Sequence, residues 1–269
     1  KQGYVITLRK LYYQLVSKNI IPNKSSAYDN IGKIVKEARM AGLLDWDIIV
    51  DRTRHISQLN HWQNPGEIIR SASHWYHIDT RIDQPTYVEI WSEKDALASV
   101  FEPVCNKYDV PLFTCRGYPS TTAKHDAAKR LKQQEYRNPT VIYLGDHDPS
   151  GLDITRNLRE DFDTFGCFFL EIRRIALTMA QIEEYRLPPQ PVKGSDGRTP
   201  KYIAEHGCQS CWELDALIPD VLSKLVEDAI NELTDHTKLA VQRELQLSHR
   251  NELREIADRY DYGGDEIAF

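Results

Sequence analysis

The chain has 269 residues, of which 41% are hydrophobic and 28% charged, and its net charge is −6. This ordinary globular composition excludes a disordered tail, a collagen-like fibre and a disulfide-stapled miniprotein. The sequence has no apolar run near the ~18–20 residues of a membrane span, no signal-peptide pattern, and five irregularly spaced cysteines, which together predict a soluble, cytoplasmic protein.

The net charge is unevenly distributed along the chain. Residues 1–60 contain ten basic and five acidic side chains, a charge of +5, whereas the remaining 209 residues carry −11. A basic module ahead of an acidic one indicates binding of a polyanion such as nucleic acid. A basic, merely solvated helix surface is the alternative.

The first 60 residues predict a small helical module. Apolar residues recur at helical spacing over residues 8–16, behind Thr7 as an N-cap, and again over residues 31–41. Residues 46–51 predict a short strand, followed by the basic turn 52–54. Helices followed by a strand and a basic loop are typical of a winged-helix variant of the helix-turn-helix.

After a polar, turn-rich stretch, the pattern alternates between strand and helix. Strands are expected at residues 87–91, 110–115, 141–144 and 167–172, with helices at 96–108, 122–136 and 152–162, and further helices beyond Pro219. Repeated strand–helix units predict a mostly parallel sheet with function at the carboxyl ends of its strands. We therefore expect a winged-helix domain over 1–62, a linker over 63–85, and an α/β domain with C-terminal helices over 86–269.

Acidic residues follow two of the predicted strands. Asp146 and Asp148 come directly after strand 141–144, and Glu93 follows strand 87–91. If the two strands are neighbours, the three carboxylates converge at one edge of the sheet, and oxygen ligands of this kind hold Mg²⁺. The alternative is that Asp146 lies in a turn and that Asp148 or Ser150 caps the next helix.

Tyr13 is a candidate nucleophile on the first helix. It points about 130° away from the apolar face to which Tyr12 belongs, given ~100° of rotation per residue. Arg9 lies one turn earlier, so its guanidinium can approach the Tyr13 hydroxyl, favour the phenolate and bind a phosphate. An exposed tyrosine beside an exposed arginine on an amphipathic helix is the alternative.

Two further groups are candidates for binding. Candidate DNA contacts are the second-helix stripe and the basic turn: Lys33, Lys36, Arg39, Arg52 and Arg54. A solvated helix face explains the stripe as well. Cys208 and Cys211 have a zinc-like spacing, but the sequence has no second pair, so a zinc site stays open.

Several motifs resemble one known family. Residues 7–13 (Thr-Leu-Arg-Lys-Leu-Tyr-Tyr) resemble the tyrosine motif of the type IIB DNA topoisomerases, in the family of the topoisomerase VI cleavage subunit and the meiotic double-strand-break protein. Residues 93–96 resemble the glutamate motif of a Toprim domain, and segments 116–120, 146–151 and 213–217 resemble later family motifs in the same order. The chain looks like a small standalone bacterial or phage version, and the resemblance covers roughly residues 5–217.

The resemblance implies a fold, a reaction and a set of site residues. The fold is a winged-helix domain carrying the tyrosine, followed by a Toprim domain. The residues implied are Tyr13 as nucleophile with Arg9, Glu93, Asp146 and Asp148 as ligands of Mg²⁺ (or Mn²⁺), and Lys94, His147, Gly117 and Tyr118 in support. Two copies would pair so that each tyrosine meets the metal site of the other.

We therefore expect Mg²⁺-dependent double-strand cleavage of duplex DNA through a 5′-phosphotyrosyl link, by a cytoplasmic, nucleoid-associated homodimer. No nucleotide-binding loop occurs, so we expect no bound nucleotide, and a B-type ATPase subunit is possible as a partner but is not indicated. The alternatives are a Toprim metal-dependent hydrolytic nuclease and a non-catalytic DNA-binding protein. The first two differ at Tyr13, since Tyr13→Phe abolishes cleavage only if the tyrosine is the nucleophile.

Overall fold

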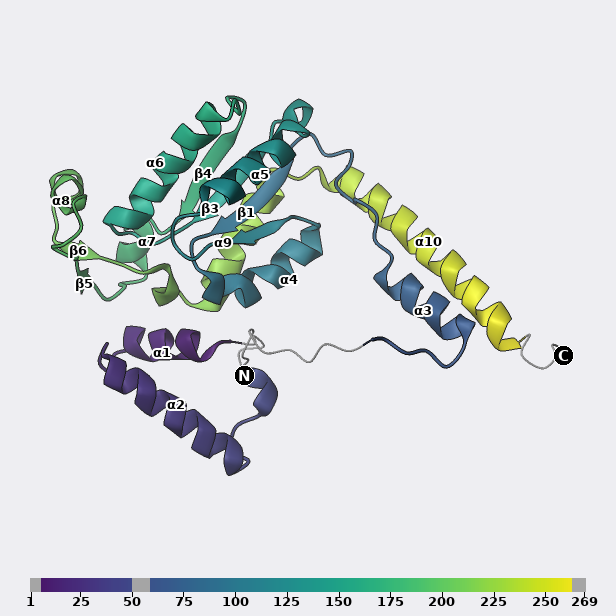
Figure 1. Cartoon of the computed structure of the whole chain (residues 1–269), viewed down its shortest axis with the longest axis horizontal. Helices are drawn as coiled ribbons and strands as arrows, with labels where there is room; N and C mark the ends of the chain where they lie inside the picture. Colours follow the sequence, from purple (N-terminus) through teal and green to yellow (C-terminus); the bar gives the residue numbers. More distant parts are fainter. Residues whose placement is uncertain (1–5, 50–58, 263–269) are drawn as a thin grey trace. The chain divides into compact units, whose positions relative to one another are not determined.

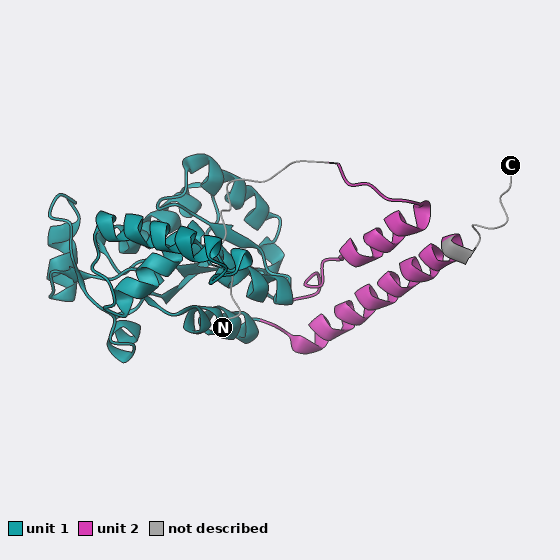
Figure 2. Ribbon diagram, turned by 90° about the horizontal axis from the view of Figure 1, so that it is seen from below, with its two compact units in different colours: residues 1–53, 86–233 teal, residues 54–85, 234–269 magenta. Residues whose placement is uncertain are grey.

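The computed structural model describes residues 6–49 and 59–262, with side chains through residue 260. The expected basic turn with Arg52 and Arg54 lies outside these residues. Contacts divide the chain into two units, one of residues 1–53 and 86–233 and one of residues 54–85 and 234–269 (Figure 2). The first unit therefore holds both the tyrosine helix and the sheet, and residues 234–269 group with 54–85 rather than with the sheet.

A four-stranded parallel sheet forms the centre of the first unit. Its strands are β1 (Val88–Ser92), β2 (Leu112–Thr114), β3 (Thr140–Leu144) and β4 (Glu171–Ala176), in the order β2-β1-β3-β4. The α/β class with a mostly parallel sheet is thus confirmed. The fourth strand begins four residues later than expected, because residues 167–170 form a turn in which the Leu170 N–H donates to the Cys167 carbonyl (3.0 Å).

Helices cover both faces of this sheet. The larger ones are α4 (Ala98–Tyr108), α5 (Thr121–Lys132), α6 (Pro149–Thr164) and α9 (Pro219–Glu232), with short helices α7 (Met179–Glu184) and α8 (Thr199–His206) nearby. Figure 1 shows α5 and α6 on one side of the sheet and α4 and α9 on the other. The α/β part of the unit also contains the hairpin of β5 (Gln190–Pro191) and β6 (Ser210–Cys211) and the 3₁₀ turns η2 (Asp95–Leu97), η3 (Glu135–Arg137) and η4 (Leu214–Ala216).

The core explains why β1 and β3 were recognisable in the sequence. All five residues of each strand are buried, as expected for a parallel sheet covered on both faces. Trp91 and Tyr143 pack with Leu131 of α5 and with Leu158 and Phe162 of α6. This cluster fixes the position of the loops that leave the carboxyl edge of the sheet.

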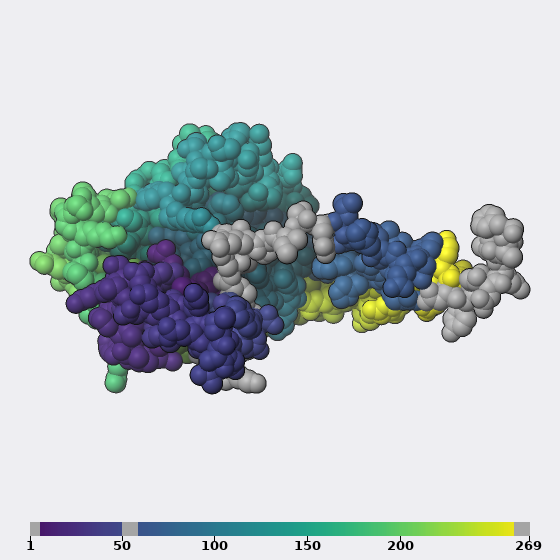
Figure 3. All heavy atoms as spheres, turned by 60° about the horizontal axis from the view of Figure 1, so that its bottom comes forward, coloured from purple at the N-terminus to yellow at the C-terminus, as the bar shows by residue number. Residues whose placement is uncertain are grey.

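The N-terminal segment contains the two predicted helices, α1 (Leu8–Ser17) and α2 (Ser25–Met40), seen as a lobe of the surface in Figure 3. Thr7 caps α1 as expected, since its hydroxyl accepts the Lys10 N–H (3.2 Å). The strand expected at 46–51 is wrong in its described part: Trp46–Ile48 is a 3₁₀ turn (η1), and Ile49 forms a single bridge with Ile6. Asp45 favours the turn because its carboxylate accepts the Asp47 N–H (3.0 Å).

The second unit is a pair of helices, α3 (Pro65–Trp75) and α10 (His236–Tyr262), which we call the arm. Residues 63–85 were expected to be a linker, but Asn64 caps α3 by accepting the Glu67 N–H (2.9 Å), and Pro65 occupies the first turn. The two helices lie side by side (Figure 2). In the described part of the chain, none of the helices, α10 included, is both long and apolar enough to span a membrane.

Candidate active site at the carboxyl edge of the sheet

Two of the predicted acidic residues meet at the carboxyl edge of the sheet. Strands β1 and β3 are parallel neighbours with Ser92 opposite Leu144, so Glu93 and Asp146 leave the sheet side by side. The Asp146 N–H donates to Glu93 Oε2 (2.9 Å), and both residues are buried. We call Glu93, Asp146, Asp148 and Glu213 the acidic edge.

Two glycines allow the loop 145–151 to fold tightly over Glu93. A Cβ atom at Gly151 would lie 2.3 Å from the Asp146 carbonyl oxygen, and one at Gly145 would lie 2.7 Å from Glu93 Oε2. Real Cβ atoms do not approach other atoms this closely, so a side chain at Gly151 would displace the loop backbone, and one at Gly145 would displace the Glu93 carboxylate. The glycines are therefore required by the close approach of the acids.

Arg174 of β4 holds the same loop and was not singled out in the sequence. Its guanidinium donates to the carbonyl oxygens of Gly145 (2.9 Å), Asp146 (2.6 Å) and Gly151 (3.0 Å). Burial lowers the pKa of Arg174, while the nearby carboxylates oppose this effect. The fourth strand was expected to end at residue 172, so the sequence placed Arg174 beyond the sheet and gave no signal for this role.

A distant segment brings Glu213 to the acidic edge. His147 and Trp212 pair through their backbones (2.8 and 3.0 Å), and the Leu214 N–H donates to Asp146 Oδ1 (2.8 Å). Glu213 lies between these two anchored residues. The late acidic motif thus joins the site, a placement that spacing along the chain does not reveal.

Lys94 supplies a positive charge within the acidic edge. Its Nζ lies 2.6 Å from Asp146 Oδ2 and 3.2 Å from Glu213 Oε2. Burial disfavours the ammonium, but the two carboxylates outweigh burial, so the pKa of Lys94 is raised. Lys94 therefore remains charged and neutralises part of the acidic edge.

The other two residues of the Asp-His-Asp motif have structural partners. Asp148 caps α6, with its Oδ1 accepting the Gly151 N–H (2.6 Å), as the capping alternative predicted. His147 is buried, and a hydrogen bond joins its Nδ1 to the Tyr202 hydroxyl (3.0 Å). Burial, and then the neighbouring His206, lower the pKa of His147 to about 4, so its ring is neutral at pH 7.

The donor chemistry of the acidic edge fits a divalent cation. Burial raises the pKa values of both Glu93 and Asp146, so their carboxylates need a nearby positive charge to remain ionised. Within the described residues, however, the structure gathers no group of three or more His, Cys, Asp and Glu side chains in metal-binding geometry. Lys94 holds the position between Asp146 and Glu213, so a metal there requires movement of that ammonium.

Tyr13 and Arg9 are in contact on α1. Arg9 Nη2 donates to the Tyr13 hydroxyl at 3.5 Å, and the guanidinium lies 5.6 Å from the centre of the ring. Burial and the Glu213 carboxylate raise the pKa of Tyr13, outweighing Arg9 and Lys94. The expectation of a favoured phenolate is therefore wrong in its net effect. Helix α1 contacts η2 and η4, the turns that directly follow Lys94 and Glu213, so the Tyr13–Arg9 pair lies on a helix beside the acidic edge of its own chain.

A buried lysine fixes α1 next to this edge. Lys10 is 1% exposed, and its Nζ donates to the carbonyl oxygens of Asp215 (3.1 Å) and Leu217 (3.3 Å). The ammonium also pairs with Asp215 Oδ1 at 3.7 Å. Helical periodicity marks Lys10 as an ordinary polar residue, so its role in packing could not be recognised without the contact to η4.

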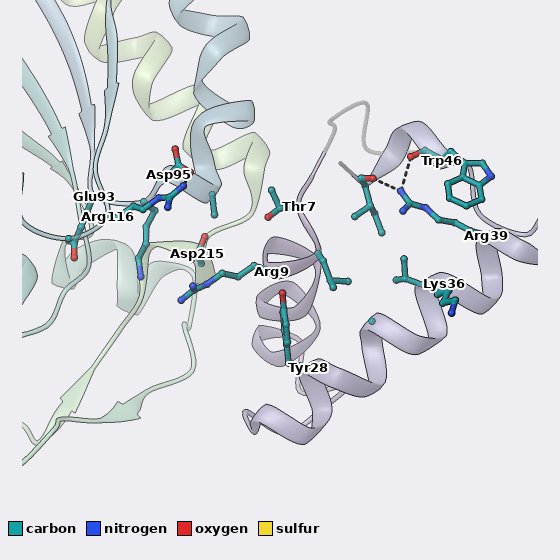
Figure 4. A pocket seen from close by; sticks show the side chains of 17 residues that line it. Thr7, Arg9, Tyr28, Lys36, Arg39, Trp46, Glu93, Asp95, Arg116 and Asp215 are labelled. Atoms are coloured by element: carbon teal, nitrogen blue, oxygen red, sulfur yellow. Dashed lines mark hydrogen bonds and ion pairs between the residues drawn. The ribbon is translucent and has the colours of Figure 1, made fainter. Parts of the chain in front are cut away.

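A pocket of about 860 Å³ lies between the N-terminal helices and the sheet edge (Figure 4). Its lining includes the basic residues Arg9, Lys36, Arg39, Lys94 and Arg116. Arg39 is engaged within its own segment, because its guanidinium donates to the carbonyl oxygens of Trp46 (2.7 Å) and Ile49. Lys33, which the sequence grouped with these two, is exposed on α2 and does not line the pocket.

The remaining candidates are more dispersed. Gly117, at a φ of +79°, lines the pocket, whereas the Tyr118 hydroxyl donates to Asp153 Oδ2 (2.6 Å) on α6. The thiols of Cys208 and Cys211 point to the carbonyl oxygens of Ser210 (3.6 Å) and Pro191 (3.7 Å). These cysteines take part in no metal-binding group that the described residues form.

Comparison with known proteins adds no family assignment to this geometry. No protein-family model matches the chain, and no curated protein or solved structure matches it significantly. The winged-helix and Toprim assignments therefore depend on the motifs and on the placement of their residues.

Proposed function

We propose that the chain is a Mg²⁺-dependent enzyme that cleaves duplex DNA through Tyr13. In this proposal α1 and α2 belong to a winged-helix domain that binds the DNA, and the sheet belongs to a Toprim domain that holds the metal. The observation that carries the proposal is that Arg9, whose guanidinium donates to the Tyr13 hydroxyl, lines the same pocket as Glu93 and Lys94. Enzymes that cleave phosphodiesters in this way use a nucleophile, a guanidinium that binds the phosphate and carboxylates that hold a metal ion. The basic lining of that pocket supports a polyanionic substrate.

In this proposal the chain's own residues bind the phosphate and move one proton. Arg9 binds the scissile phosphate through its guanidinium while it holds the Tyr13 hydroxyl. The phenolic oxygen attacks phosphorus, so that a P–O bond to the tyrosine forms and the P–O3′ bond breaks. Glu213, whose charge already acts on Tyr13, accepts the phenolic proton, and the leaving 3′ oxygen takes up a proton from water.

The metal would be held by the carboxylates of Glu93, Asp146 and Asp148, with Glu213 close by. When bound, Mg²⁺ supplies positive charge that stabilises the charge developing on the phosphate and the leaving oxygen. Arg174 and the two loop glycines keep Asp146 beside Glu93 for this purpose. Lys94 balances the same carboxylates when no metal is present.

The test is cleavage of supercoiled plasmid in Mg²⁺, stopped with detergent and analysed with and without protease. Wild type is compared with Tyr13→Phe and with Tyr12→Phe, its matched neighbour on the buried face of α1. We expect breaks whose 5′ ends carry protein, lost in Tyr13→Phe and retained in Tyr12→Phe. Asp146→Asn should also remove the breaks, whereas Asp163→Asn, at an exposed aspartate of α6, should not.

One observation favours a second candidate, a hydrolytic nuclease. Glu93 and Lys94 line the pocket, whereas Tyr13 does not, so water activated at the acidic edge is the competing attacker. Protein-free ends that persist in Tyr13→Phe but disappear in Asp146→Asn would establish this reaction and contradict the tyrosine mechanism. Binding of DNA without breaks under any of these conditions would contradict both reactions.

A further inference from the structure

The arm has a row of apolar side chains that α3 does not cover. On α10, Val241, Leu245, Ile256 and Tyr260 are 58%, 44%, 41% and 55% exposed. At ~100° per residue they fall within about 100° of the helix circumference, so they form one stripe about 28 Å long. The side of α10 that faces α3 lies roughly 100° around the helix from the centre of this stripe. It carries the buried residues Leu239 and Ala257, and Gln246, whose side-chain oxygen accepts the Ile78 N–H.

The arm is short of buried apolar surface of its own. Among its described hydrophobic residues only Leu239 and Ala257 are buried. Two helices held by so little apolar burial are marginal by themselves, because most helical stability in proteins comes from packing of an apolar face. A further helix surface against the stripe would supply this burial.

The spacing of the stripe is symmetric about its midpoint. Val241 and Tyr260 lie equally far from the point between Arg250 and Asn251, and so do Leu245 and Ile256. A second α10 running antiparallel about that point therefore places Val241 opposite Tyr260 and Leu245 opposite Ile256. An isologous two-fold interface requires this kind of self-complementary arrangement.

Charge favours the same orientation. In the antiparallel register Glu252 faces His249 and Arg259 faces Gln242, so no like charges meet. A parallel pairing would instead oppose Glu252 to Glu252 and Arg259 to Arg259, and like charges at such positions destabilise helix pairs. The complementarity thus points to a second copy of this chain in one orientation.

We propose that the stripe of Val241, Leu245, Ile256 and Tyr260 binds the same stripe of a second copy, antiparallel, so that two arms form a four-helix bundle. The inference does not depend on the proposed reaction, because no residue of the pocket or the acidic edge takes part. It predicts a dimer whose contacts lie in the arm and whose two-fold axis passes beside residues 250 and 251.

Sedimentation of the full chain at micromolar concentrations tests the interface. We expect a dimer for wild type, and at least about 30-fold weaker dimerisation for Leu245→Glu and for Ile256→Glu, as for hot-spot residues. The matched control is Leu247→Glu, at a 54% exposed leucine on another side of α10, which should leave the dimer intact. A monomeric wild type, or a dimer that both stripe variants leave unchanged, would overturn the proposal.

Cysteine cross-linking tests the register even if a glutamate variant folds poorly. The pair Leu245→Cys with Ile256→Cys should give a disulfide-linked dimer when copper phenanthroline and air oxidise the two facing thiols. The pair Leu247→Cys with Arg254→Cys has the same sequence symmetry on another face and should not exceed the wild-type background from the five native cysteines. Equal cross-linking of both pairs, or of neither, would contradict the antiparallel stripe.

Discussion

The sheet and the arm are stabilised in different ways. In the sheet, every residue of β1 and β3 is buried, and aromatic and aliphatic side chains from α5 and α6 complete the core. In the arm, the two segments 59–85 and 234–260 are joined by polar contacts, such as Arg70 with Asp258 (3.0 Å) and Gln84 with the Asp235 carbonyl (2.9 Å). Apolar burial alone can stabilise the sheet and its helices, whereas the arm depends on hydrogen bonds and ion pairs and, in our proposal, on a second copy of the chain.

Hydrogen exchange should show the largest difference between the two regions. Backbone amides of β1 and β3 open only with the whole unit, whereas those of α3 open by local separation of two helices. If the opening free energies differ by about 3 kcal/mol, exchange in the strands is about 100-fold slower. Mass-spectrometric exchange on the intact chain measures this ratio, and equal protection of the two regions would remove the distinction.

Breaking the ion pair between the buried Glu89 of β1 and Arg130, whose side chain is 43% exposed, should have the next largest effect. Glu89 is 1% exposed, and Arg130 donates to both of its carboxylate oxygens (2.7 and 2.9 Å). Arg130→Met removes the charged partner of a carboxylate that stays buried. We therefore expect a loss of about 3 kcal/mol in the free energy of unfolding.

Urea unfolding, followed by labelling of the buried thiols of Cys105 and Cys115, measures that loss. The control is Arg156→Met, whose partners Asp153 and Glu160 lie at the surface of α6, and which should change stability by less than about 1 kcal/mol. Similar losses in the two variants would show that the buried position of Glu89 is unimportant.

Leu239→Ala should affect the arm alone. The side chain is 1% exposed, so its truncation is expected to destabilise α3 and α10 by about 2 kcal/mol. Because all five cysteines lie outside the arm, thiol labelling reports only on the other unit and should not change. Hydrogen exchange of the α3 amides should accelerate in Leu239→Ala, whereas the control Leu247→Ala, at the surface, should leave it unchanged. A simultaneous increase in thiol labelling would mean that the two units unfold together.

The smallest effect is expected from Tyr76→Phe. This change removes the hydroxyl that is hydrogen-bonded to His249 (2.9 Å) and should cost about 1 kcal/mol in the arm. Exchange rates of α10 near residue 249 measure it against Tyr136→Phe at a 76% exposed tyrosine. No difference between the two variants would indicate that polar contacts do not hold the arm together.

Where one local pattern determined the structure, the sequence predicted it well. The apolar runs of β1 and β3, the cap at Thr7 and the i, i+4 spacing of Arg9 and Tyr13 need only their neighbours along the chain, and the structure contains all four. The meeting of Glu93 with Asp146 followed from the rule that parallel strands share their carboxyl edge.

The features that were missed depend on distant partners. Lys10 is buried because carbonyl oxygens more than 200 residues away accept its protons, and Arg174 became important only when loop 145–151 folded over it. The pKa of Tyr13 shows the same limitation, since the sequence revealed the cation at Arg9 but neither the burial nor the approach of Glu213. Helix α3 was hidden by its turn-like start at Pro65, which in fact begins the helix.

The division of the arm into two segments has a consequence for synthesis of the protein. Helix α3 leaves the ribosome before the sheet, and α10 follows it only after residues 86–233 have been made. At ~5–20 residues per second, this interval is roughly 7–30 s. During that time α3, with its 73% exposed Trp75, has no partner helix, so the nascent chain must complete the sheet before the arm can form.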